Sequence, residues 1–167
     1  NGKQKETTFF SNAKKILAAN SIRLLRISDF GTTGAKGPAT EGKPWHSLVK
    51  SSAVSDKPDP TAGGSFGIGK SAVFTISQLQ TVFYSTIYSE SGITQFLGQG
   101  KTRFMSHENE KGLKKKATGY WGQMSGFKPV NDIDKVPEWL KRNKPGTSVF
   151  AVGCSLIPDW KERMAYS

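Results

Sequence analysis

The stretch Gly64–Ser71, GSFGIGKS, fits the P-loop pattern G-x-x-x-x-G-K-[ST] at every position. A P-loop joins a buried β-strand to a helix, so that backbone N–H groups and the helix N-terminus point at bound phosphates. The residues from Lys70 to Leu79 predict the helix. The preceding residues 52–63, SAVSDKPDPTAG, contain two prolines and two aspartates and predict no strand. A P-loop nucleotide kinase with Lys70 as its essential residue is therefore disfavoured.

Two further motifs flank this stretch in the sequence. Residues 21–28, SIRLLRIS, are apolar on both faces, which predicts an inner strand, and they run directly into Asp29–Gly34, DFGTTG. Residues 146–152, GTSVFAV, predict a late strand entered through a Gly-Thr turn. Between the first motif and GSFGIGKS lies a segment, residues 35–66, with only a short helix predicted near WHSLVKSS. Such a long segment with little regular structure is typical of a functional lid.

The rest of the chain predicts further regular elements. Residues 6–19 have the apolar spacing of an amphipathic helix. TVFYSTIYS alternates aromatic and β-branched residues and predicts a strand, and ITQFLGQGKTRFM predicts another strand. VPEWLKRN predicts a short helix, and residues 157–167 predict the start of a last helix.

Taken in this order, the three motifs resemble those of the GHKL superfamily, the Bergerat-fold ATPases. That group includes type II topoisomerases, ninety-kilodalton heat-shock chaperones, histidine kinases, and mismatch-repair and MORC-type ATPases. The resemblance covers residues 22–153 and is closer to the chaperone, mismatch-repair and MORC-like members. It implies an α+β, two-layer α/β sandwich with a mixed, mostly antiparallel sheet, helices on one face, and an ATP lid at residues 35–66.

The same resemblance implies the roles of individual residues. Asp29 would accept a hydrogen bond from the adenine amino group, with Thr147 as its partner directly or through water. Glycines in DFGTTG would let the backbone turn beside the base, and glycines before the helix would bring backbone N–H groups to the phosphates. The ATP-binding residues expected on this basis are Asp29, Gly31, Thr32, Thr33, Gly34, Gly64, Phe66, Gly67, Ile68, Gly69, Lys70, Ser71 and Thr147.

Two features depart from the family pattern. The family box Asp-x-Gly-x-Gly is one residue longer here, so Thr32 and Thr33 are expected to take part of the role of its second glycine. The family also has a helix with a catalytic Glu and, four residues later, an Mg²⁺-binding Asn. Asn12 is the internal candidate, but Thr8 stands where the acid is needed. We expect that helix to precede Asn1, so the catalytic and metal-binding residues are unknown.

The expected function is ATP binding with Mg²⁺, and slow ATP hydrolysis that drives a conformational change in a larger multidomain protein. Residues 1–167 would form one ATP-binding domain of that protein, and nucleotide would promote a homodimer of the full-length chain. The formal net charge of +11 favours an alternative, a nucleic-acid-binding module without ATPase activity. No apolar run reaches about 18 residues, so no membrane partner is expected. The single cysteine, Cys154, suggests a reducing, cytoplasmic setting.

Overall fold

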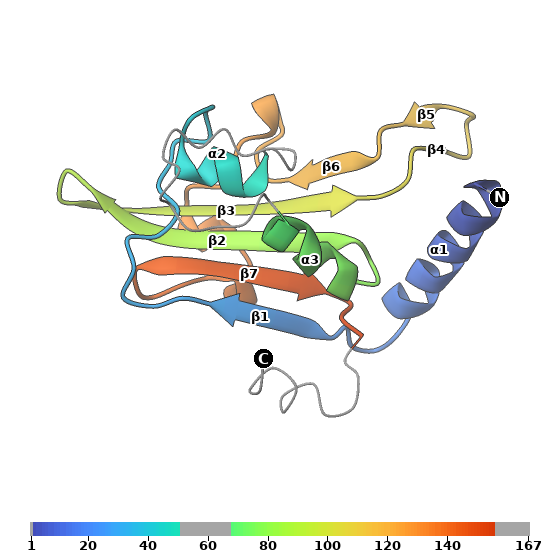
Figure 1. Cartoon of the computed structure of the whole chain (residues 1–167), viewed down its shortest axis with the longest axis horizontal. Helices are drawn as coiled ribbons and strands as arrows, with labels where there is room; N and C mark the ends of the chain where they lie inside the picture. The colour runs from blue at the N-terminus through green and yellow to red at the C-terminus, as the bar shows by residue number, and fades with distance from the viewer. Residues whose placement is uncertain (1, 51–67, 156–167) are drawn as a thin grey trace.

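A five-stranded sheet forms the centre of the molecule (Figure 1). The computed structural model describes residues 2–50 and 68–155. All neighbouring strands pair antiparallel, in the order β1-β7-β2-β3-β6. This confirms the expected α/β fold with a mostly antiparallel sheet. The strands are β1 (Leu24–Ser28), β7 (Gly146–Val152), β2 (Thr81–Glu90), β3 (Ile93–Arg103) and β6 (Thr118–Trp121).

The hairpin of β2 and β3 supplies the two longest strands. Its sequence is rich in β-branched and aromatic residues, which pack well on a pleated surface. Ser91 and Gly92 connect the strands, and both have positive φ, 51° and 78°. Two positive φ values match the type I′ turn, whose twist suits a two-residue hairpin. The sequence correctly predicted both strands, and it correctly predicted β7 as well.

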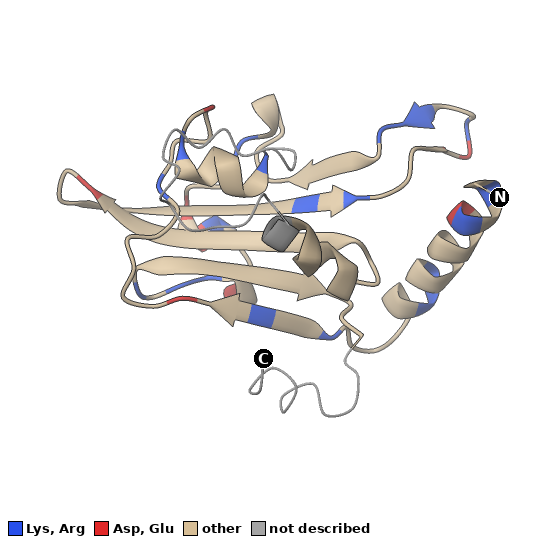
Figure 2. Ribbon diagram, in the orientation of Figure 1, with Lys and Arg blue, Asp and Glu red and all other residues tan. Residues whose placement is uncertain are grey.

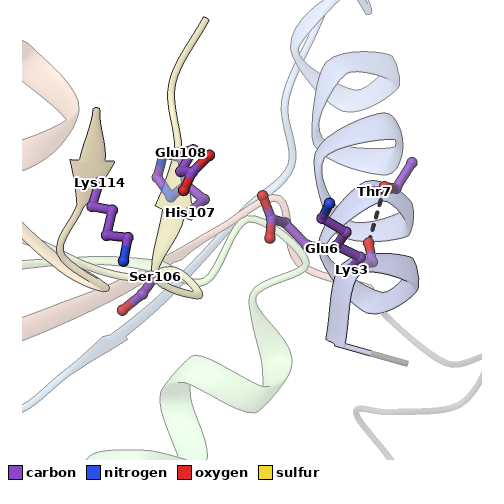
Figure 3. Close-up of a pocket in the computed structure, with 7 residues that line it drawn as sticks. All are labelled: Lys3, Glu6, Thr7, Ser106, His107, Glu108 and Lys114. Atoms are coloured by element: carbon purple, nitrogen blue, oxygen red, sulfur yellow. Dashed lines mark hydrogen bonds between the residues drawn. The ribbon is translucent and has the colours of Figure 1, made fainter. Parts of the chain in front are cut away.

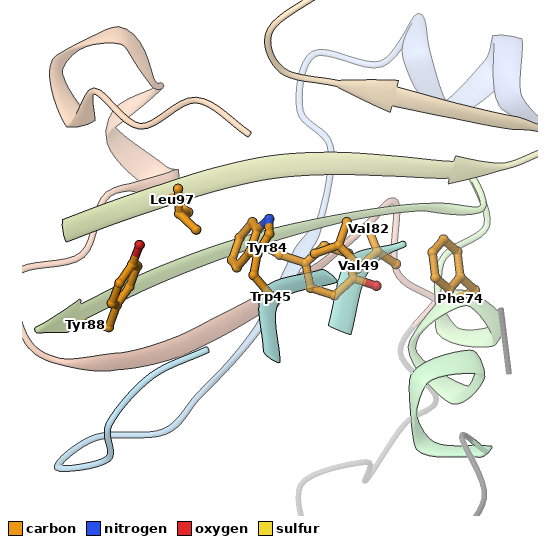
Figure 4. Close-up of a cluster of buried hydrophobic side chains, with 7 residues drawn as sticks. All are labelled: Trp45, Val49, Phe74, Val82, Tyr84, Tyr88 and Leu97. Atoms are coloured by element: carbon orange, nitrogen blue, oxygen red, sulfur yellow. The ribbon is translucent and has the colours of Figure 1, made fainter. Parts of the chain in front are cut away.

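One face of the sheet is covered by α2 (Pro44–Val49) and α3 (Ile68–Ile76) (Figure 1). Trp45 and Val49 of α2 and Phe74 of α3 are buried against alternate residues of β2 and against Leu97 of β3 (Figure 4). Alternate strand residues share a face, so this core follows directly from the pleat. The short helix expected near WHSLVKSS is confirmed as α2, and the helix after GSFGIGKS is confirmed as α3.

The opposite face of the sheet is covered as well. Phe96 and Phe150 pack there against Val136 and Leu140, which belong to a segment of 3₁₀ turns. The turns are η1 (Ser125–Phe127), η2 (Ile133–Lys135) and η3 (Glu138–Leu140). The short helix predicted in VPEWLKRN is seen as the single 3₁₀ turn η3, which begins directly after Pro137. The expected arrangement with helices on one face alone is only partly seen.

The strand predicted at SIRLLRIS is confirmed as β1, but the inner position predicted for it is not seen among the described residues. β1 pairs with β7, with Leu24 opposite Val152, and no other described strand pairs with its outer edge. Leu24 and Ile27 are accordingly 38% and 43% exposed. Apolar residues on both faces of this strand predicted that both faces would be buried, but the described residues leave part of the strand exposed.

The remaining elements lie at one end of the sheet (Figure 1). α1 (Gly2–Leu17), predicted from residue 6, has no buried residue and contacts the rest of the chain through Phe9 and Phe10, which pack on Phe104. β4 (His107–Glu108) and β5 (Lys114–Lys115) form a small ribbon beside it. The helix predicted over residues 157–167 lies outside the described residues.

Candidate functional site

Asp29 follows β1 directly and lies opposite Thr147 of β7. The Asp29 N–H donates to the Thr147 carbonyl at 3.1 Å, and the Thr147 N–H donates in return to Oδ1 of Asp29. The register explains this meeting, because Ser28 pairs with Ser148 in antiparallel strands and the next residue pair is therefore Asp29 and Thr147. The structure thus brings together two residues that are 118 positions apart in the chain.

Arg142 lies behind Asp29 and holds the end of β1. Its Nη2 donates to the Asp29 carbonyl at 2.7 Å and is 4.0 Å from Oδ1 of the same residue. Its Nη1 donates to Oγ of Ser148. The Arg142 side chain is only 1% exposed, and this burial lowers its pKa, while the Asp29 carboxylate raises it. An arginine stays charged even so, because a guanidinium in a protein is not deprotonated.

The second carboxylate oxygen of Asp29 keeps its acceptor capacity. Within residues 2–50 and 68–155, Oδ2 makes no hydrogen bond, and the side chain is 48% exposed. Oδ1, in contrast, is fixed by the Thr147 N–H and the Arg142 guanidinium. The carboxylate therefore has one oxygen that sets its orientation and one that can accept from a ligand.

Asp29 lines a cavity of about 470 Å³ between α2 and the β1–β7 end of the sheet. This volume lies in the range of small-molecule sites, which are mostly apolar with a few placed polar groups. Ile27 and Val149, which are register partners, form part of its floor, and Leu48 of α2 lies on another side. The complete lining is Ile27, Asp29, Ala35, Pro44, Ser47, Leu48, Thr147 and Val149.

Thr86 of β2 anchors the loop after Asp29, although no sequence motif points to it. Its Oγ1 donates to the Gly146 carbonyl at 3.0 Å and accepts the Ala35 N–H at 3.0 Å. The Ala35 N–H also lies 3.0 Å from Oγ1 of Thr147. Thr86 lies in the regular strand β2, TVFYSTIYSE, and its sequence context does not distinguish it from an ordinary core threonine. Only its position opposite Thr147 in the sheet reveals the contact.

The predicted glycines of this loop differ in their surroundings. Gly31 and Gly34 both have positive φ, 70° and 68°. A Cβ at Gly34 would lie 2.5 Å from the Ile87 carbonyl oxygen, whereas a Cβ at Gly31 would meet open space. Thr32 accepts the Gly34 N–H at 3.3 Å, and Thr33 is exposed. The Thr32 hydroxyl therefore supports the turn to Gly34, and Gly34 allows the close approach of this loop to β2.

The residues expected from the sequence to contact phosphate are only partly described. Gly64, Phe66 and Gly67 lie outside the described residues, and so does the part of the expected lid from residue 51 onward. Ile68, Gly69 and Lys70 form the first turn of α3, where only the backbone is described. Ser71 accepts a hydrogen bond from Arg103 of β3 at 3.2 Å. Its described contact is therefore with β3 and not with the Asp29 cavity.

A second cavity, of about 590 Å³, lies between α1 and the β4–β5 ribbon (Figure 3). Glu6 of α1 and His107 and Glu108 of β4 contribute to it, together with lysines from both sides. His107 lies 2.9 Å from the Met105 carbonyl through Nδ1. α1, which has no buried residue, forms one wall of this cavity. Among the residues that the structure describes, no three acidic, histidine or cysteine side chains group as a metal site.

The comparisons with known proteins gave no relatives. No protein-family model, curated protein or solved structure matches the chain. In the described ranges, no helix has both the length and the apolar character needed to cross a membrane.

Proposed function

We propose that the chain binds ATP in the Asp29 cavity, as an ATP-binding domain of Bergerat type. The observation that supports this most directly is the Asp29 carboxylate, with Oδ1 fixed by Thr147 and Arg142 and Oδ2 left as an acceptor. The apolar side chains of Ile27, Leu48 and Val149 offer a nonpolar surface on which a purine ring could pack. A carboxylate at the edge of such a surface accepts from an exocyclic amino group.

This arrangement favours adenine over guanine. Adenine presents an amino donor at the position where guanine presents a carbonyl acceptor. A carboxylate oxygen pairs with the donor and repels the acceptor, and the unpaired polar groups would cost binding free energy. We therefore expect ATP and adenosine to bind and GTP to bind much more weakly.

The triphosphate would lie toward the first turn of α3, whose backbone N–H groups lack partners within the helix. A helix N-terminus attracts anions through its dipole and its unpaired donors. The described residues include no cluster suited to Mg²⁺, and none is assigned as a catalytic base. We accordingly propose nucleotide binding for these residues and assign no metal-dependent or hydrolytic step to them.

The test measures ATP, adenosine and GTP binding by isothermal titration calorimetry. We expect Asp29→Asn to weaken ATP binding by about tenfold or more, because one acceptor oxygen becomes an amide donor. Asp134→Asn, at an exposed position on η2, is the matched control and should bind ATP like the wild type. Unchanged ATP affinity in Asp29→Asn together with its loss in Lys70→Ala would overturn the proposal in favour of a P-loop.

A further inference from the structure

A third cavity, of about 380 Å³, is lined mostly by cations. Lys101 and Arg103 come from the end of β3, Lys116 precedes β6, and Lys50 directly follows α2. Thr118 and Tyr120 of β6 complete the polar part of the wall. None of the described residues that line this cavity is acidic. We refer to it as the basic pocket.

The sheet register explains why these side chains converge. Lys101 pairs with Tyr120 and Arg103 with Thr118 across β3 and β6. Alternate residues of a strand share a face, so all four point to one side of the sheet. Lys101 also pairs with Val82, which lies in the core under α2 and α3. The basic pocket is thus on the helix-covered face, as is the Asp29 cavity, but at the opposite edge of the sheet.

Two ammonium groups are held against one aromatic ring. Nζ of Lys50 and Nζ of Lys101 lie 5.6 and 5.7 Å from the centroid of Tyr120. Lys101 is only 5% exposed, and its Nζ donates to the Val49 carbonyl at 2.6 Å. Holding like charges together with partial desolvation opposes their charged forms. Burial, followed by the charge of Lys128, lowers the pKa of Lys50.

Arg103 is oriented rather than free to swing into solvent. Its Nη1 donates to Oγ of Ser71 at 3.2 Å, and its guanidinium lies 4.6 Å from the centroid of the Phe74 ring. In the described part of the chain, no carboxylate forms an ion pair with Arg103 or with Lys50. A fixed guanidinium with donors left over is well suited to a planar or tetrahedral oxyanion.

We propose that the basic pocket binds a phosphate group, with Arg103 and Lys50 as its main charged contacts and the Thr118 hydroxyl as a further donor. A purely structural role explains Lys101, because its ammonium caps the last carbonyl of α2. Lys50 also donates to the Gly126 carbonyl at 3.4 Å, and Arg103 contacts Ser71 and Phe74, but these neutral groups do not compensate the positive charges. Lys50, Arg103 and Lys116 therefore lie together on a pocket wall that has no acidic residue among its described members. A bound phosphate would offset the repulsion among them.

This inference does not depend on ATP in the Asp29 cavity. The phosphate has two possible sources, the terminal phosphates of a nucleotide or a separate phosphorylated small molecule. Both would present the same oxyanion to Arg103 and Lys50. The probes are therefore chosen to measure the phosphate contact first and its source second.

The first experiment titrates inorganic phosphate and tripolyphosphate into the whole chain by calorimetry, at constant ionic strength set with chloride. We expect Arg103→Gln and Lys50→Gln each to weaken tripolyphosphate binding by about tenfold. Arg23→Gln and Lys14→Gln remove the same charges at exposed positions away from the pocket and should bind like the wild type. Equal affinity in all five proteins, or no binding at millimolar probe, would overturn the proposal. Because Arg103 packs on Phe74, the Lys50 variant keeps the test valid if Arg103→Gln unfolds.

The second experiment identifies the source. If Arg103→Gln weakens ATP but not adenosine, and tripolyphosphate competes with ATP, the pocket holds the phosphates of the nucleotide. If ATP and tripolyphosphate bind together and Arg103→Gln leaves ATP affinity unchanged, the pocket serves a separate ligand. Asp29→Asn should retain wild-type tripolyphosphate binding in both cases. If ATP does not bind, the proposal for the basic pocket can still hold. If tripolyphosphate does not bind, the proposal for the Asp29 cavity can still hold.

Discussion

Gly31 and Gly34 have nearly the same backbone conformation, yet the structure requires glycine more strictly at Gly34. Their φ values are 70° and 68°, in the left-handed region that costs other residues about 1–2 kcal/mol. Only Gly34 also lies against β2, where a Cβ would approach the Ile87 carbonyl to 2.5 Å and Oγ1 of Thr86 to 2.7 Å. Close approach to β2 is what holds the loop beside Asp29.

We therefore expect Gly34→Ala to lower the free energy of unfolding by about 2–4 kcal/mol, because backbone strain and a steric clash add. Gly31→Ala is the matched control and should cost about 1 kcal/mol, from backbone strain alone. Urea unfolding followed by tryptophan fluorescence measures both values. Equal losses in the two variants would mean that the contact with Ile87 does not constrain the loop.

Thr86 joins three segments through one hydroxyl. Thr86→Val keeps the shape of the side chain but removes the donor to Gly146 and the acceptor for Ala35. Since the Gly146 carbonyl is then left without this donor at a buried position, we expect a loss of about 1–3 kcal/mol in unfolding free energy. Thr94→Val, at an exposed position on β3, should change stability by less than about 0.5 kcal/mol. A neutral Thr86→Val would contradict this role.

Of the contacts around Asp29, only those between residues of recognisable sequence motifs could be predicted. Asp29 and Thr147 stand in recognisable patterns, DFGTTG and GTSVF, so their meeting could be predicted. Thr86 and Arg142 stand in no motif, and their contacts depend on which strands become neighbours. Their roles follow from sheet register, which a single sequence does not reveal.

At the scale of elements, the strands were easier to predict than their places in the sheet. The alternation in TVFYSTIYSE and the small turn residues at Ser91–Gly92 are local signals, so β2 and β3 could be predicted. The position of β1 could not, because its only described partner is β7, at the other end of the chain. Apolar residues on both faces indicate burial, but they do not indicate which element provides it.

β2 is buried over most of its length, and its position affects the ionisation of Tyr84. Burial raises the pKa of Tyr84 to about 12, with Arg103 opposing the effect. An unfolded chain ionises the same phenol near pH 10. The contribution of Tyr84 to stability is therefore fully present below about pH 10 and is lost as the pH rises through about 12.

The wild type should lose roughly 1.4 kcal/mol of unfolding free energy per pH unit in this window through Tyr84. Tyr84→Phe should remove that slope while staying within about 0.5 kcal/mol of the wild type at pH 8, since the described residues make no hydrogen bond to this hydroxyl. Guanidinium unfolding at pH 8, 10 and 11 measures the difference between the two proteins. A difference that stays constant across the three pH values would show that Tyr84 ionises normally in the folded state.

At the scale of the whole molecule, the charge of +11 does not gather on one surface. Figure 2 shows lysine and arginine on α1, β1, β3 and β5, at both ends of the sheet and with few acidic neighbours. A nucleic-acid interface needs a stripe of cations that follows the phosphate backbone. In the basic pocket four cations line a common cavity, and its volume of about 380 Å³ suits a single small group.

We therefore expect nucleic acid to bind only weakly and without sequence preference. Scattered cations neutralise few phosphates at once, so the dissociation constant should be no better than about 10 µM near physiological salt and should weaken as salt rises from 50 to 200 mM. Fluorescence anisotropy with a labelled single strand and a labelled duplex measures both quantities.

In a second experiment, ATP should raise the melting temperature of the chain more than either oligonucleotide does. The opposite result would be a melting temperature raised by DNA but not by ATP, with a dissociation constant for DNA below about 0.1 µM at 200 mM salt. In that case a nucleic-acid-binding module would explain the chain better than an ATP-binding domain does.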